Sequence, residues 1–308
     1  MTAAVYALLA AGLVAAVAGS AARAWWYARH PTHLRWELYP VPHEAPARAR
    51  YGGSYFETSE WWHVARHRNT LGELLFMARE IVFLHALHAS NRRLWYRSFP
   101  FHAGLYLVVA AGFALLATAL AAAFAWAPAA PVWLALQRAC AALGWAGVAL
   151  TMAGAAALLA YRLTDRTMKQ ATTPGDLFNL ALFIVAPGLL AAGAWLRPAG
   201  SPDLLAAVTG LLTWDTSLPI PGLLGAGIVA CAALAAYIPM THMSHFIGKY
   251  FTYHSVRWDD APLADRSRVM AAIATQLTWR PTWSASHMGA DGKRTWADVA
   301  SSNPTREP

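Results

Sequence analysis

The chain has 308 residues, of which 57% are hydrophobic and only 13% are charged. Soluble domains carry roughly 25% charged residues, so a value near half of that indicates an integral membrane protein. The two cysteines, Cys140 and Cys231, lie in separate apolar stretches, which excludes a disulfide framework and a CxxC metal site.

Residues 3–22 carry no charge and are long enough, at about 1.5 Å per residue, to cross the hydrocarbon core of a bilayer. The small residues around Ser20 would also suit a cleaved signal peptide. Such a peptide needs a basic segment before its apolar run, and the sequence has none there. We therefore expect residues 1–22 to form a retained transmembrane helix.

Residues 23–100 are polar, aromatic and rich in arginine, and we expect them to lie outside the bilayer. The prolines of residues 33–44 predict extended chain, because each biases the preceding residue away from helix. Apolar residues at helical spacing over residues 73–88 predict an amphipathic helix that lies on the membrane surface or against a partner. His85 and His88 within it have a spacing that suits a metal, although histidines at an interface are more often hydrogen-bonded surface residues.

Four further apolar runs are long enough to span a membrane, at residues 101–127, 133–161, 177–196 and 219–246. Pro128 and Pro131 separate the first two of these runs, since proline ends helices. Thr173 and Pro174 suit the N-cap and the first position of the helix that follows them. The apolar run at residues 204–214 is too short to cross, which predicts an interfacial or re-entrant piece.

These runs predict an all-α membrane protein, a bundle of five transmembrane helices. Of the 24 lysines and arginines, 22 fall on one side of this arrangement. The positive-inside rule places that side in the cytoplasm, with the N-terminus outside and the C-terminus inside, so the net charge of +8 reports orientation rather than nucleic-acid binding. The expected parts are a first transmembrane helix (1–22), a cytoplasmic segment with the amphipathic helix (23–100), a four-helix membrane core that carries the candidate site described next (101–248) and a cytoplasmic tail (249–308).

Histidines at the ends of two different spans are the strongest candidates for a functional site. His102 opens the second span, and His242 and His245 close the fifth, so all three fall at matching depth near the cytoplasmic face. An imidazole within a membrane span is costly to bury and indicates function. Two neutral imidazoles from different helices can bind one haem iron from opposite sides, and the small residues nearby, Gly104 and Gly227 among them, would leave room for the ring. The residue pattern alone leaves His242 and His245 open as the second ligand, and a hydrogen bond between helices is the simpler explanation of either.

The pattern ATTPGDL at residues 171–177, followed after a span by PMTHMSH at residues 239–245, resembles the cytochrome b (gamma) subunit of respiratory nitrate reductases. The segments HLRWELYP, YGGSYFE, NRRLWYRSFPFHAGLYL and KYFTYHSVRWDD are similar to a branch of this superfamily that accompanies heterodisulfide-reductase-like iron–sulfur subunits. In that family a proline of the last span is followed six residues later by a haem-ligating histidine, whose partner lies early in the second span. The resemblance therefore implies His102 and His245 as the axial ligands of haem b.

One departure from the family matters. The family's second haem uses histidines at positions that are Gly112 and Gly227 here. The resemblance thus implies a single haem, the one near the cytoplasm, and leaves the family's quinol site, which lies beside the second haem, unplaced. The haem propionates would need cations at the cytoplasmic rim, and Arg97 and Arg162 are placed to supply them, although both also suit ordinary flanking arginines that set topology.

We expect a membrane cytochrome b subunit of a respiratory oxidoreductase complex in a bacterial or archaeal cytoplasmic membrane. It would pass electrons between the quinone pool and a cytoplasmic iron–sulfur subunit, heterodisulfide-reductase-like or nitrate-reductase-beta-like, through one bis-histidine haem b. A periplasmic cytochrome c is a further candidate partner. The chain has no CxxC or CxxxC cluster motif, so the next redox centre must lie on another chain. The alternatives are a haem-free membrane anchor for a catalytic subunit and a transporter, which the lack of acidic residues and lysine in the spans disfavours.

Overall fold

A computed structural model describes residues 1–35, 38–65, 67–126, 129–260 and 267–303. Within these ranges, five helices are long and apolar enough to cross a membrane. They are α1 (Thr2–Arg29), α5 (Arg92–Ala123), α6 (Ala130–Thr164), α8 (Pro174–Trp195) and α10 (Gly222–Tyr237), the last extended by a short turn. The predicted all-α bundle of five transmembrane helices is confirmed.

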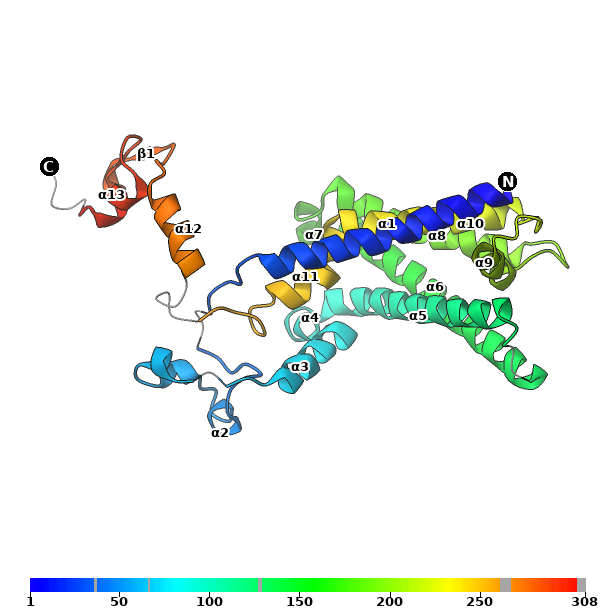
Figure 1. The fold of residues 1–308 in the computed structure, drawn as a ribbon, viewed down its shortest axis with the longest axis horizontal. Helices are drawn as coiled ribbons and strands as arrows, with labels where there is room; N and C mark the ends of the chain where they lie inside the picture. The colour runs from blue at the N-terminus through cyan, green and yellow to red at the C-terminus, as the bar shows by residue number, and fades with distance from the viewer. Residues whose placement is uncertain (36–37, 66, 127–128, 261–266, 304–308) are drawn as a thin grey trace. The chain divides into compact units, whose positions relative to one another are not determined.

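The five spans lie side by side in one unit formed by residues 1–32 and 69–257 (Figure 1). α5 packs along α6, and α10 packs along both α1 and α8. The short helix α9 (Leu204–Thr213) lies with the N-terminus at one end of the bundle, while α7 (Arg166–Gln170) and α11 (His245–Thr252) lie at the other. We refer to these as the α9 end and the α11 end.

Glycines bring neighbouring spans into backbone contact. A Cβ added to Gly104 would lie 2.3 Å from the backbone nitrogen of Thr151 in α6, and one added to Gly227 would lie 2.4 Å from the Cα atom of Leu190 in α8. Close approach of this kind needs small residues at the helix crossing. The expectation that Gly104 and Gly227 leave room for a cofactor is therefore wrong, because both serve helix packing, whereas a Cβ on Gly112 would meet open space.

The start of α8 follows the local prediction. The Thr173 hydroxyl accepts a hydrogen bond from the Asp176 backbone N–H (3.3 Å), and the Asp176 carboxylate accepts one from the Thr173 backbone N–H (2.9 Å). This reciprocal capping box, with Pro174 at the first helical position, confirms the predicted N-cap. Pro131 lies in the first turn of α6, and Pro128 lies outside the described residues.

Two spans are longer than their charge-free runs. α1 continues beyond residue 22 to Arg29, and α5 begins at Arg92 rather than at residue 101. Arginines at these helix ends can extend their charged groups toward water while the helix itself continues. The apolar piece predicted at residues 204–214 is confirmed as a helix too short to span, α9.

The fifth predicted run is not one helix. α10 ends at Tyr237, and two short 3-10 turns, η3 (Ile238–Met240) and η4 (His242–Ser244), separate it from α11. Pro239 lacks the backbone N–H that a continuing helix would use, so the helix ends near it. The expectation of a continuous span to residue 246 is wrong, and His245 opens a helix of its own.

The amphipathic helix predicted over residues 73–88 is divided in two. α3 (Thr70–Phe83) ends where Leu84 adopts a left-handed conformation with φ of 50°, and α4 (His85–Ser90) follows. This conformation is uncommon for a residue with a side chain. The Trp95 indole donates a hydrogen bond of 2.8 Å to the last carbonyl of α3, which satisfies a group that the helix end would otherwise leave open.

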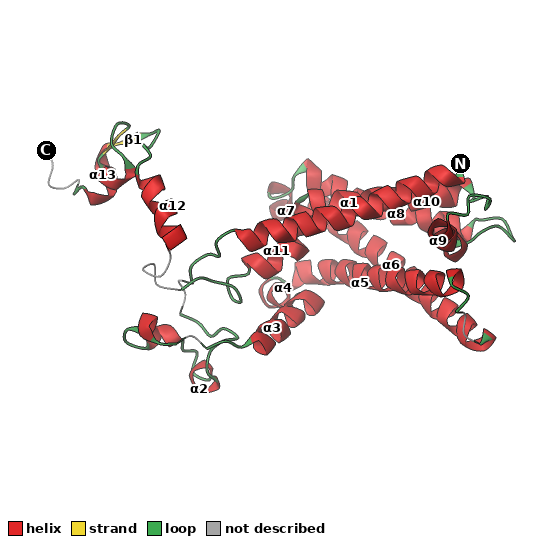
Figure 2. Ribbon diagram, viewed as in Figure 1, coloured by secondary structure: helices red, strands yellow, loops and turns green. Residues whose placement is uncertain are grey.

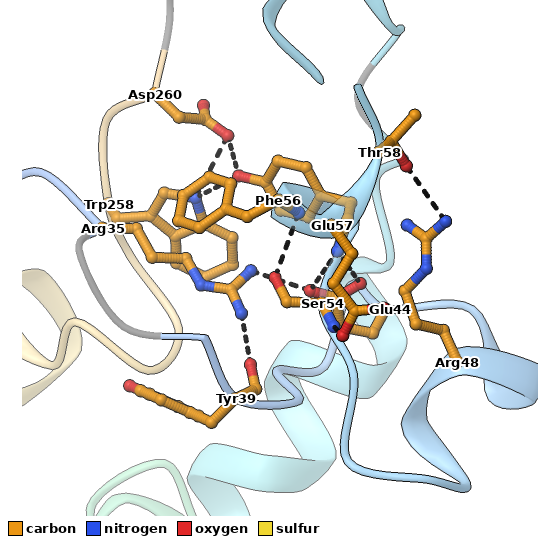
Figure 3. Close-up of polar contacts among 11 residues, drawn as sticks. Arg35, Tyr39, Glu44, Arg48, Ser54, Phe56, Glu57, Thr58, Trp258 and Asp260 are labelled. Atoms are coloured by element: carbon orange, nitrogen blue, oxygen red, sulfur yellow. Dashed lines mark hydrogen bonds and ion pairs between the residues drawn. The ribbon is translucent and has the colours of Figure 1, made fainter. Parts of the chain in front are cut away.

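Residues 33–68 and 258–303 form a second unit. A buried ion pair lies at its centre, with Arg35 Nη1 2.8 Å from Glu44 Oε1 and side chains only 0% and 1% exposed. Arg35 also donates to the Tyr39 carbonyl, and its guanidinium lies 5.2 Å and 5.3 Å from the ring centres of Tyr55 and Trp258 (Figure 3). The ion pair and the ring contacts offset part of the cost of burying this charge.

The same network ties together segments that are far apart in the sequence. The Tyr55 hydroxyl donates to the Asp260 carboxylate, and the Trp258 indole lies within hydrogen-bond distance of both groups, at 3.1 Å and 3.3 Å (Figure 3). The Asp259 backbone N–H donates to the His33 carbonyl at 2.8 Å. Burial, followed by the hydrogen bond to Asp260, raises the pKa of Tyr55 to about 12.

The remaining elements of this unit are short (Figure 2). They are α2 (Pro46–Ala49), η1 (Tyr55–Glu57), η2 (Trp61–His63), α12 (Ser267–Leu277), β1 (Ser284–Ala285), η6 (Ser286–Met288), β2 (Ala290–Asp291) and α13 (Trp296–Ser301). β1 and β2 pair antiparallel, with Ser284 opposite Asp291.

Candidate functional site

His102 and His245 lie next to each other at the α11 end of the bundle. His102 is carried by α5, and His245 is the first residue of α11. Their ring centres are 6.3 Å apart, and the ring planes are inclined by 69°. The structure thus brings together two of the three histidines that the sequence singles out, from two different elements.

In each of these rings, one nitrogen is held by a backbone carbonyl. His102 Nδ1 lies 2.7 Å from the Ser98 carbonyl, and His245 Nδ1 lies 3.3 Å from the His242 carbonyl. A carbonyl oxygen only accepts, so in the neutral ring Nδ1 carries the proton and Nε2 keeps its lone pair. Metal-binding histidines are commonly oriented in this way, through a hydrogen bond donated by the nitrogen that does not bind the metal.

His242 has a different environment. Its Nε2 lies 3.5 Å from Asp176 Oδ1 and 3.4 Å from Asn179 Nδ2, both in the first turns of α8, and its side chain is 65% exposed. The nitrogen that is free in His102 and His245 is therefore engaged in His242. This geometry favours His245 over His242 as the partner of His102.

A groove of about 520 Å³ opens beside His242 and His245, between the last turns of α1 and residues 240–252. It is lined by Arg23 and Tyr27 from α1 and by Lys249 from α11. Arg23 Nε donates to the Pro239 carbonyl at 3.0 Å, which fixes the guanidinium next to the break after α10. The groove next to His245 is thus lined by two cationic side chains, Arg23 and Lys249, and by the phenol of Tyr27.

Sequence reasoning did not single out Arg23 or Tyr27. The only local signal is their position, since they follow the first apolar run directly and therefore belong to its end. Their proximity to His245 arises from the packing of α1 against α11, in which the rings of Tyr27 and Phe251 stack with centres 5.9 Å apart.

Arg97 and Arg162, the cations predicted for haem propionates, have other partners. The Arg97 guanidinium lies 4.4 Å from the ring centre of Tyr161, across the α5–α6 contact. Arg162 donates to the Thr172 hydroxyl at 3.2 Å and lies 3.6 Å from Asp176. These contacts give both arginines a role in joining the spans at the α11 end, and their role toward a cofactor stays a prediction.

Other candidate metal ligands are scattered. His88 packs its ring against Trp95, with centres 4.8 Å apart. Cys140 and Cys231 are free thiols. Among the residues that the structure describes, no group of three or more histidine, cysteine, aspartate or glutamate side chains could hold a metal ion.

Fold and site together define a multi-pass α-helical membrane protein in which two imidazoles from different helices lie 6.3 Å apart, centre to centre, near one end of the bundle. Comparison with protein-family models, with curated proteins and with solved structures found no match.

Proposed function

We propose that the protein is a membrane cytochrome b subunit that carries electrons through one haem held by His102 and His245. The observation that supports this most is the mutual position of the two rings, 6.3 Å between centres. Imidazole nitrogens bind first-row metals at about 2.0–2.1 Å, as zinc sites show, so two imidazoles on opposite sides of one ion have ring centres roughly 6 Å apart. The separation of the two ring centres therefore matches the value expected for two imidazole ligands of a common iron.

The tautomer of the two neutral rings, with the proton on Nδ1, supports the same proposal. Both Nδ1 atoms donate to backbone carbonyls, of Ser98 and His242, and both Nε2 atoms are left to bind. Ligands fixed in this way need little rearrangement when a metal enters, and the carbonyls strengthen the basicity of the imidazoles. When bound, a haem with two histidine ligands supplies one-electron transfer and has no free position for a substrate.

Two basic side chains suit the anionic propionates of such a cofactor. Arg23 and Lys249 line the groove next to His245, at the rim of the bundle. Arg23 Nε also donates to the Pro239 carbonyl and Lys249 also pairs with Glu80, so the propionates would accept from the remaining N–H groups of the two side chains. Charge-assisted hydrogen bonds between these cations and carboxylates would orient the ring edge toward the aqueous side. Arg97 and Arg162 lie at the same end of the bundle and stay candidate partners of the propionates as well.

Within this proposal, electrons pass between the quinone pool and a cytoplasmic iron–sulfur subunit, in a bacterial or archaeal cytoplasmic membrane with the N-terminus outside. The sequence supports it through the resemblance to nitrate reductase gamma subunits and through the basic residues concentrated on one side of the spans. At the positions where the family it resembles carries its second pair of haem ligands, this chain has Gly112 and Gly227, so a single haem is proposed.

The deciding experiment is a reduced-minus-oxidised spectrum with haem quantification on the purified full chain. We expect one b-type haem per chain in the wild type, its loss in His102→Ala and His245→Ala, and its retention in His242→Ala. Far-ultraviolet circular dichroism should show that all variants keep their helices. Loss of haem in the His242 variant and retention in the His245 variant would reverse the ligand assignment.

A wild-type protein without any reducible absorption band would overturn the proposal and leave a haem-free membrane anchor. The quinone link is tested separately, by adding a naphthoquinol to the haem-loaded protein in lipid nanodiscs. Reduction of the haem by the quinol supports the link. If dithionite reduces the haem and the quinol does not, the proposed exchange of electrons with the quinone pool is contradicted.

A further inference from the structure

The helix α3 has two sides of opposite exposure. Glu73, Met77 and Glu80 share one face and are buried. The opposite face exposes a continuous apolar stripe, made of Leu71, Leu74, Leu75, Ala78, Ile81 and Val82. The three leucines are 55–68% exposed. A helix on the surface of a soluble domain has the reverse arrangement, with its apolar stripe turned toward the protein.

Contacts with α5 place this stripe beside the membrane-spanning part of the bundle. The Tyr106 hydroxyl donates to the Ile81 carbonyl at 2.6 Å. Tyr106 lies in the charge-free part of α5 and shares a helix face with Val109 and Phe113, which are 56% and 70% exposed. Exposed apolar side chains on a membrane span face lipid, so α3 adjoins a lipid-facing surface.

The charges around α3 suit the headgroups of lipids. Both of its carboxylates are turned inward, and Glu80 Oε1 lies 2.7 Å from Lys249 Nζ in a pair that is largely buried. The exposed charges nearby are basic, namely Arg79 on α3 and Arg92 and Arg93 in the first turn of α5. Basic residues beside an apolar stripe are typical of helices that lie in the interface of an anionic membrane.

We propose that α3 is an interfacial helix, with its apolar stripe seated among the acyl chains of the adjacent leaflet and its basic rim on anionic phospholipid headgroups. Lipid is the occupant because the stripe continues the lipid-facing surface of α5 around Tyr106. The helix is bonded to α5 through Ile81 and to α11 through Glu80. It therefore joins the two elements that carry His102 and His245, whether or not these bind a cofactor.

The test measures how close lipid comes to α3 in the full chain. In a Cys140→Ala, Cys231→Ala background, a bimane label is placed at Leu75→Cys and the protein is reconstituted into nanodiscs with phosphatidylglycerol and brominated phospholipid. Val109→Cys on the exposed face of α5 is the lipid-facing control. Lys169→Cys in the exposed helix α7, at the same end of the bundle, is the aqueous control.

We expect brominated lipid to quench the label at residue 75 as strongly as the label at residue 109, and severalfold more than the label at residue 169. Iodide in the buffer should show the opposite order. A label on Ala78→Cys provides a second position on the stripe if the first variant does not fold. Quenching of both stripe labels by iodide at the level of residue 169 would overturn the proposal, because it would show that the stripe faces water rather than lipid.

Discussion

Gly104 in α5 lies so close to Thr151 in α6 that a Cβ atom at Gly104 would stand 2.3 Å from the backbone nitrogen of Thr151. Gly104→Ala should therefore push the two helices apart and lower the free energy of unfolding by about 1–3 kcal/mol, the usual cost of overpacking. The free energy is measured by titrating the protein from mild detergent into sodium dodecyl sulfate.

Gly112 provides the matched control for this prediction, because it is on the same helix and a Cβ there would meet no atom within 4 Å. Gly112→Ala should leave stability unchanged or raise it by about 0.5–1 kcal/mol through helix propensity. Equal losses in the two variants would show that the contact between α5 and α6 does not depend on the glycine.

Glu80 and Lys249 couple α3 to α11, and Lys249→Met should leave the Glu80 carboxylate buried without its cation. We expect a loss of about 1–3 kcal/mol of unfolding free energy, because a buried group that loses its partner keeps its desolvation cost. Adding Glu80→Gln to the Lys249 variant should restore part of this loss. A double variant less stable than the Lys249 variant would contradict the pairing.

His245→Met replaces the proposed imidazole ligand with a thioether, which can also bind haem iron. A histidine–methionine pair of ligands raises the reduction potential of a haem, so the midpoint should move upward by some fraction of the roughly 0.8 V that axial ligands span. A spectroelectrochemical titration of the purified protein measures it. His242→Met is the control and should leave the midpoint where it is. A shift in the control alone would assign the ligand to residue 242.

Arg35→Met removes the cation of the buried pair with Glu44 in the second unit. Breaking such a pair by removing one partner costs about 3–5 kcal/mol, because the remaining charge is uncompensated. Amide hydrogen exchange of residues 54–57 should accelerate strongly, while that of α5 and α6 stays the same. Arg50→Met, at an exposed position of the same segment, should change nothing measurable. Unchanged exchange in the Arg35 variant would contradict a stabilising role of the pair.

The raised pKa of Tyr55 predicts that the stability of the second unit depends on pH. Its pKa is raised from 10.0 to about 12 by burial and by the hydrogen bond to Asp260, so the folded state holds the proton more tightly than the unfolded state. The contribution to stability is fully present below pH 10 and is lost as the pH rises toward 12. Hydrogen exchange, corrected for its intrinsic pH dependence, should show this loss in the wild type. Tyr55→Phe should be less stable below pH 10 and should lack the additional loss.

The parts of the fold that the sequence predicts well are those decided locally. Thr173, Pro174 and Asp176 fix the start of α8 within four residues, and an apolar run decides a span by its length alone. The break after Tyr237 also has a local signal in Pro239, but hydropathy continues through it and conceals it. Leu84 has no recognisable signal in the sequence for its left-handed conformation. The break there is accompanied by hydrogen bonds from the Trp95 indole of α5 to the Phe83 carbonyl and from the Ala86 N–H to the Glu80 carboxylate.

The candidate site could be predicted only in part, because contacts between distant segments bring its residues together. The residue pattern identifies His102 and a pair of later histidines, and within the sequence only the family resemblance selects His245. The contacts of Asp176 and Asn179 with His242 Nε2, which favour the same choice, arise from packing. The pairing of Glu80 with Lys249 joins residues that no sequence pattern connects.

The interruption between α10 and α11 also separates His245 from the membrane span. The fifth span runs through α10 to Met240, whereas His245 is the first residue of a separate short helix. Because α11 packs against the end of α1, the position of the His245 ring depends on that contact rather than on the register of α10 in the bilayer.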